Sequence, residues 1–139
     1  MKVLGSLIAS AALTLSVLVA VPAPATAAPY PGTVATRCSY AVPGAVKRNR
    51  QLRVAYRVAA RGNARPSGTV YFAVYKATRR GLKFVRLAAN RYTGPRIQFR
   101  SLGKFKKGQY YTRMAFRPGS QNSVFKPCGT GLRGFRVKR

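Results

Sequence analysis

The chain has 139 residues, with 27 Lys or Arg side chains and no Asp, Glu or His, so its formal net charge is +27. Without a side-chain carboxylate or imidazole it has no general acid or base for neutral pH, no catalytic triad or glycosidase carboxylate pair, and no His, Asp or Glu metal ligand. The remaining Lys, Tyr, Ser and Thr side chains lack a base to activate them. We therefore expect a non-enzymatic protein with no catalytic residue, cofactor, metal site or small-molecule substrate.

The N-terminal 27 residues have the parts of a secretory signal peptide. Lys2 precedes an apolar run over residues 3–21, and residues 25–27 (Ala-Thr-Ala) form a small-residue cleavage site, with residues 23–25 as a second choice. An uncleaved membrane anchor is the alternative, because the apolar run approaches spanning length. We expect one mature domain over residues 28–139 that is secreted. Its positive charge is the property that could retain it at the cell envelope.

The mature domain has two cysteines, Cys38 and Cys128. An even number of cysteines in an exported chain indicates a disulfide. An intramolecular bridge would close nearly the whole domain, and an intermolecular bridge is the alternative. The wide spacing of the two residues argues against a redox or zinc motif.

Alternation of apolar and polar residues predicts short strands separated by turns rich in Gly, Pro and Asn. The expected strands are residues 33–42, 52–58, 69–77, 82–88, 97–99, 109–117 and 132–138, with residues 123–125 extended. Residues 47–50 are expected to form a basic connector, and residues 61–68, 79–81 and 90–95 to form turns. About seven antiparallel strands with no helical spacing after the signal indicate an all-β sandwich, and an open barrel is the alternative.

The inward positions of these strands define the expected core. Its members are Val54, Tyr56, Val70, Phe72, Tyr110, Met114 and Phe116. Phe105, between lysines, is expected to close one end of the core, and insertion into a membrane interface is the alternative.

Two motifs resemble those of bacterial immunoglobulin-like repeat domains. Residues 66–72 (Pro-Ser-Gly-Thr-Val-Tyr-Phe) resemble their Pro-x-Gly-x-Val-x-Phe opening, and Leu102 with residues 108–116 resembles their Leu…Gly-x-Tyr-x-Val-x-Ala-x-Tyr strand. The resemblance spans about residues 54–138. It implies an immunoglobulin-like β-sandwich in which Tyr110 is a tyrosine corner, with a buried ring and a hydroxyl bonded to nearby backbone. It implies the fold rather than the adhesive role of those tandem repeats.

Outward aromatic and basic side chains indicate a surface for a polyanion, because Arg pairs with phosphates or sulfates and aromatic rings stack on bases or sugars. If strands 69–77 and 109–117 share a sheet, their outward residues lie together. The candidate binding residues are Tyr71, Tyr75, Tyr111, Arg113, Arg117, Arg136 and Lys138, with further basic clusters at Arg79, Arg80, Lys104, Lys106 and Lys107. The alternative interpretation is that outward Tyr favours strands and outward Arg is simply solvated.

We therefore expect a secreted monomer that binds anionic envelope or extracellular polymers, such as teichoic acid, acidic polysaccharide, nucleic acid or anionic lipid headgroups. A wall-associated structural module with protein partners and a cationic antimicrobial factor are the alternatives. The chain has no cationic amphipathic helix, which argues against pore formation.

Overall fold

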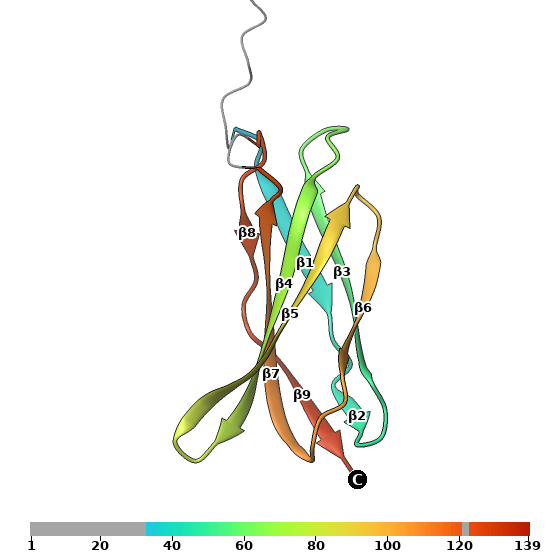
Figure 1. Ribbon diagram of the computed structural model, residues 1–139, viewed down its shortest axis with the longest axis vertical. Helices are drawn as coiled ribbons and strands as arrows, with labels where there is room; N and C mark the ends of the chain where they lie inside the picture. Colours follow the sequence, from blue (N-terminus) through green and yellow to red (C-terminus); the bar gives the residue numbers. More distant parts are fainter. Residues whose placement is uncertain (1–32, 121–122) are drawn as a thin grey trace, which may run out of the picture.

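The computed structural model describes residues 33–120 and 123–139, and the predicted signal peptide lies outside them (Figure 1). All regular structure in this part of the chain is β-strand, which confirms the all-β prediction. The nine strands are β1 (Thr36–Ala41), β2 (Ala45–Lys47), β3 (Leu52–Ala60), β4 (Ser67–Thr78), β5 (Gly81–Thr93), β6 (Gln98–Gly103), β7 (Gly108–Pro118), β8 (Cys128–Gly129) and β9 (Arg133–Lys138). The described residues contain no helix that could cross a membrane.

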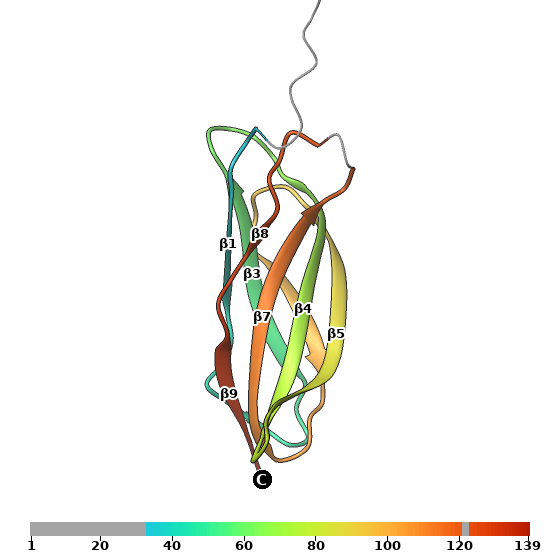
Figure 2. The ribbon, with the colours of Figure 1, turned by 90° about the vertical axis from the view of Figure 1, so that its left-hand side faces the viewer.

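The strands form two sheets that face each other (Figure 2). The three-stranded sheet has the order β1-β3-β6, and the six-stranded sheet has the order β2-β9-β7-β4-β5 with β8 paired to β7. Neighbouring strands are antiparallel except β2 and β9, which run parallel. The strands therefore form two separate sheets and not the open barrel that was the alternative.

Several predicted boundaries are wrong. The expected basic connector overlaps at Lys47 with β2, which was not expected, and β8 was not expected either. The expected turn over residues 90–95 is strand as far as Thr93, because β5 continues along β4 to that residue. Residues 123–125 form no strand, although Phe125 makes an isolated bridge to Val34.

Sixteen apolar residues of the described chain fill the space between the sheets. All seven predicted core residues are among them. Phe105 is also buried and packs against Tyr110 and Phe135, with ring centroids 5.2 and 5.6 Å apart. It therefore closes one end of the core, as expected, and is not exposed to a membrane.

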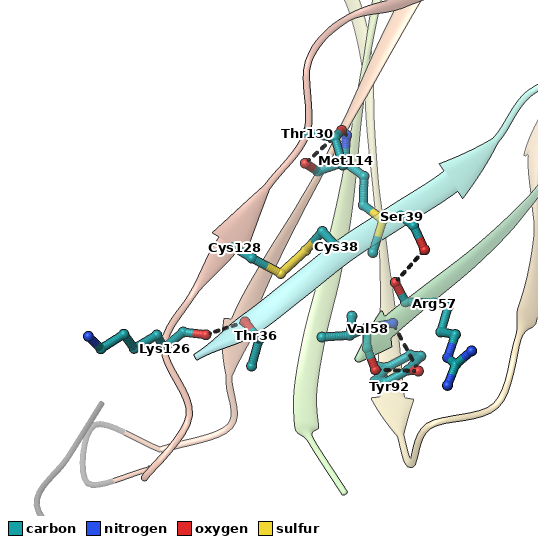
Figure 3. The surroundings of a disulfide bond; sticks show 10 residues. All are labelled: Thr36, Cys38, Ser39, Arg57, Val58, Tyr92, Met114, Lys126, Cys128 and Thr130. Carbon is teal, nitrogen blue, oxygen red and sulfur yellow. Dashed lines mark hydrogen bonds between the residues drawn. A yellow bond between two sulfur atoms is a disulfide. The ribbon is translucent and has the colours of Figure 1, made fainter. Parts of the chain in front are cut away.

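A disulfide between Cys38 of β1 and Cys128 of β8 joins the two sheets (Figure 3). The Cα atoms are 5.7 Å apart, and the described residues contain no free cysteine. The intramolecular pairing is therefore confirmed.

Tyrosine hydroxyls make further links across the core. The Tyr40 hydroxyl on β1 donates to the Thr112 carbonyl on β7. From the six-stranded sheet, the Tyr92 hydroxyl of β5 accepts from the Val58 amide of β3 at 3.0 Å and donates to the Val58 carbonyl at 3.1 Å (Figure 3). The chain has no acidic side chain, so no ion pair between side chains can link the sheets. Besides these neutral hydrogen bonds, the Arg86 guanidinium of β5 donates to the Leu102 carbonyl of β6 at 2.6 Å.

Burial affects the titration of three of these tyrosines. It raises the pKa of Tyr40, Tyr92 and Tyr110 above the ordinary value of 10.0, because a low-dielectric environment disfavours the charged phenolate. The hydroxyl of Tyr110 donates to the carbonyl of Lys106 at 2.9 Å, four residues earlier in the chain. All three side chains therefore stay neutral to a higher pH than an exposed tyrosine does.

Candidate functional site

The outer face of the six-stranded sheet collects most of the predicted aromatic and basic residues. β4 and β7 are antiparallel neighbours, so the condition on which the predicted surface depends, a shared sheet, is met. Tyr75 is opposite Tyr111, and Ala73 is opposite Arg113. Residues that are paired across neighbouring strands point to the same face, so these side chains share one surface.

A shallow hollow of about 270 Å³ lies in the middle of this surface. It is lined by Tyr71, Ala73, Leu87, Arg113, Ala115 and Arg117, contributed by β4, β5 and β7. The two alanines are the smallest side chains in the group, so they form a low floor between a ring, an aliphatic chain and two guanidinium groups. We call these six residues the sheet-face hollow.

Two predicted binding residues are in direct contact in the sheet-face hollow. The Arg117 guanidinium carbon lies 5.7 Å from the centroid of the Tyr71 ring, which is within the range of a cation–π interaction. This contact orients the guanidinium, and its N–H donors remain available at its edge. The chain has no side-chain carboxylate to neutralise Arg113 or Arg117. The sheet-face hollow is therefore built to accept an anion next to an apolar or aromatic surface.

A second group of basic residues lies at the end of the sheet that carries the C-terminal strand. Arg136, Lys138 and Lys107 line a hollow of about 390 Å³ together with Gln109. A neighbouring hollow of about 550 Å³ is lined by Lys47, Arg48, Asn49, Arg50 and Arg139. The two hollows share Arg139. We call these residues the basic end; they contain no aromatic side chain to stack on a ring.

The remaining predicted residues, among them Tyr111, line none of these three hollows. Arg79 and Arg80 lie in the turn that joins β4 to β5. Lys104 and Lys106 are exposed in the loop between β6 and β7. Tyr75 belongs to the same sheet face as the sheet-face hollow, but its ring packs edge-on against Phe84 at 5.9 Å. The twelve candidates therefore divide into several clusters and do not form one site.

Sequence reasoning missed Leu87, Ala73 and Ala115, which shape the sheet-face hollow. Alanines carry no functional signal by themselves, and the face of β5 could not be assigned by simple alternation. The apolar residues of β5 change parity, from Leu82 and Phe84 to Leu87, because the register shifts opposite Val74 and Tyr75. That parity change is the sequence signal of a β-bulge and could have located the correct face.

The chain matches no family model, and a search of curated proteins gives no significant match. The structure itself defines the class to which the protein belongs. It is an all-β, disulfide-linked domain whose surface carries only cationic formal side-chain charge. Positive donors and apolar groups line the sheet-face hollow, so its chemistry suits an anion and not a metal cation.

Proposed function

We propose that this protein is a secreted, non-enzymatic, immunoglobulin-like domain that binds anionic polymers of the cell envelope or its surroundings. The observation that carries this proposal is the sheet-face hollow, where Arg113 and the Arg117–Tyr71 pair flank an alanine floor without any acidic partner. Two features support the immunoglobulin-like part. The facing sheets are linked by a disulfide, and the buried Tyr110 bonds to the backbone of Lys106 as a tyrosine corner does.

The shape of the sheet-face hollow favours a polymer whose repeating unit joins a ring to an acidic group. Its volume of about 270 Å³ is close to the lower end of small-ligand sites, roughly 300 Å³. It would therefore hold one unit of a chain while neighbouring cations contact the next units. A ring can lie on Ala73 and Ala115 beside Tyr71, and the arginines can pair with a carboxylate, sulfate or phosphate. An acidic polysaccharide fits this description best.

Binding of heparin, used as a soluble sulfated polysaccharide, tests the proposal. The double variant Arg113→Gln with Arg117→Gln should bind at least about tenfold more weakly, since each charge-assisted hydrogen bond contributes about 1.5–3 kcal/mol. The matched control is Arg37→Gln with Arg53→Gln, which removes the same charge from exposed positions on the three-stranded sheet. Equal losses in the two double variants would leave only general charge attraction and refute the sheet-face hollow as a site.

Salt dependence separates this proposal from the alternatives. Counterion release makes binding of a polyanion weaken steeply as salt rises. Retention on heparin that does not respond to salt would contradict the proposal. A protein partner would give the opposite pattern, in which Tyr71→Ser abolishes binding and salt has little effect.

A further inference from the structure

The β4–β5 hairpin exposes an unusual row of apolar side chains. Leu82, Phe84, Val85 and Leu87 on β5 are between 43% and 57% exposed, and they make up most of the large exposed apolar residues in the described chain. β5 is the edge strand of its sheet. Figure 1 shows the turn of this hairpin diverging from the other strands. An apolar edge of this kind is normally covered or charged, so its exposure indicates a binding role.

The register of the hairpin shows that the apolar side chains share one face. Ala77 is opposite Leu82, Tyr75 is opposite Phe84, and Ala73 is opposite Leu87. Ala73, Tyr75 and Ala77 alternate along β4, so they point to one side of the sheet. Their partners on β5 point to the same side. These three pairs form the apolar face of the hairpin, which is continuous with the outer face of the six-stranded sheet.

The opposite face and the turn of the hairpin are cationic. Lys76 is directly opposite Lys83. Arg86 is on the same side but is engaged within the fold, because its guanidinium donates to the Leu102 carbonyl at 2.6 Å. The turn adds Arg79 and Arg80, both exposed. Like charges directly opposite each other on neighbouring strands are destabilising, so this pairing is unfavourable unless anions surround it. The hairpin is therefore a cationic amphipathic ribbon.

The charge decides which occupant fits the apolar face. A second copy of this chain would bring its own Arg79, Arg80 and Lys83 to the contact, with no acidic residue to meet them. A soluble polysaccharide can place a sugar ring on Phe84, but it has no hydrocarbon chain to surround Leu82. The surface of an anionic bilayer offers both hydrocarbon and phosphate, the two chemistries that the hairpin presents.

We infer that the β4–β5 hairpin inserts its apolar face into the interface of an anionic lipid bilayer. Leu82 and Phe84 enter the boundary between headgroups and acyl chains, and the long side chains of Arg79, Arg80 and Lys83 reach headgroup phosphates. The inference rests on the proposed function for its attraction to anions. It uses residues outside the arginine pair of the sheet-face hollow, so the two ideas can fail separately.

Vesicle sedimentation with the mature chain tests this inference. The probe is vesicles of phosphatidylcholine with about one part in three of anionic phosphatidylglycerol, compared with pure phosphatidylcholine. The variant Leu82→Ser with Phe84→Ser should bind the anionic vesicles at least about tenfold more weakly, because each buried apolar side chain contributes roughly one decade of affinity. It should bind heparin as tightly as the unmodified protein does.

The matched control is Ile97→Ser with Phe99→Ser, which removes two exposed apolar side chains, 60% and 72% accessible, at and near β6. It should leave vesicle binding unchanged, and thermal melts should show that both double variants are folded. Vesicle binding that is unaffected by the Leu82 and Phe84 changes, or equally reduced by the control, overturns the inference. If the protein binds heparin but not vesicles, the inference fails and the proposed function stands. If it binds vesicles but not heparin, the proposed function fails and the inference stands. If the Leu82 and Phe84 changes abolish capture of an envelope protein but leave vesicle binding intact, the hairpin binds a protein partner instead.

Discussion

Removal of the disulfide should cost this protein a large part of its stability. Cys38 and Cys128 are 90 positions apart, so the bridge closes a loop that contains nearly all of the described chain. The chain-entropy model gives about 4.6 kcal/mol for a loop of this size at 25 °C. Domains of ordinary stability have only about 5–15 kcal/mol in total. The double variant Cys38→Ala with Cys128→Ala should therefore be close to the limit of folding.

The same loss can be expressed as a shift in melting temperature. The entropy of unfolding is about 2.1 cal/mol/K per residue near 60 °C, which gives about 0.2 kcal/mol/K for roughly a hundred residues. A loss of about 4.6 kcal/mol then corresponds to a fall of roughly 20 °C.

Calorimetry of the oxidised protein, the reduced protein and the double variant at one ionic strength measures this shift. The reduced protein is the control and should melt with the variant. Added salt should raise the melting temperature of all three, because it screens repulsion among cations that have no side-chain anion as partner. A loss below about 1 kcal/mol would refute the reasoning, since it would mean that the bridge hardly restricts the unfolded chain.

Three further predictions follow from buried groups. Thr112→Val should raise the free energy of unfolding by about 1 kcal/mol in urea titrations, because the buried Thr112 hydroxyl has no hydrogen-bond partner among the described residues; a decrease would reveal a partner. Gly68→Ala should cost more than about 2 kcal/mol, because its Cβ would lie 2.2 Å from the carbonyl oxygen of Arg117; Gly44→Ala, with nothing within 4 Å, should cost less than about 0.5 kcal/mol and is the control. Burial raises the folded-state pKa of three tyrosines above 10.0, so their contribution to the free energy of unfolding should be complete below pH 10.0 and lost as pH rises through the folded-state values. Tyr110→Phe should make this alkaline loss of stability smaller. Between about pH 4 and 8 the free energy of unfolding should stay nearly constant.

The parts of the fold that could be predicted are those in which neighbouring residues carry the signal. Strict alternation assigns Val54 and Tyr56 of β3, and Met114 and Phe116 of β7, to the core, and all four are buried. Alternation also assigns Tyr71, Arg113 and Arg117 to outward faces, and the adjacency of β4 and β7, which the sequence left as a condition, brings them to one face. A period of two residues is enough to determine such faces.

The parts that could not be predicted depend on contacts between distant residues. β2 is three residues long and pairs in parallel with β9, about ninety positions later, so nothing in residues 45–47 alone marks a strand. This pairing places Lys47 opposite Lys138 and so brings the two hollows of the basic end together. Tyr92 was expected in a turn, since Asn90 and Gly94 flank it, but its hydrogen bonds to Val58 hold the end of β5 against the other sheet. Tertiary contacts override local turn signals at such positions.

The absence of acidic residues explains why binding chemistry and folding chemistry are separated in this molecule. Inside, tyrosine hydroxyls and a disulfide join the sheets, so no ion pair is needed there. Outside, no guanidinium or ammonium group has an acidic side chain as partner, so no side-chain anion of the chain competes with an external anion for the surface cations. Charge alone would attract any polyanion without distinction. Selectivity must then come from the uncharged side chains, namely Tyr71 and the alanine floor of the sheet-face hollow for rings, and Leu82 and Phe84 of the hairpin for hydrocarbon.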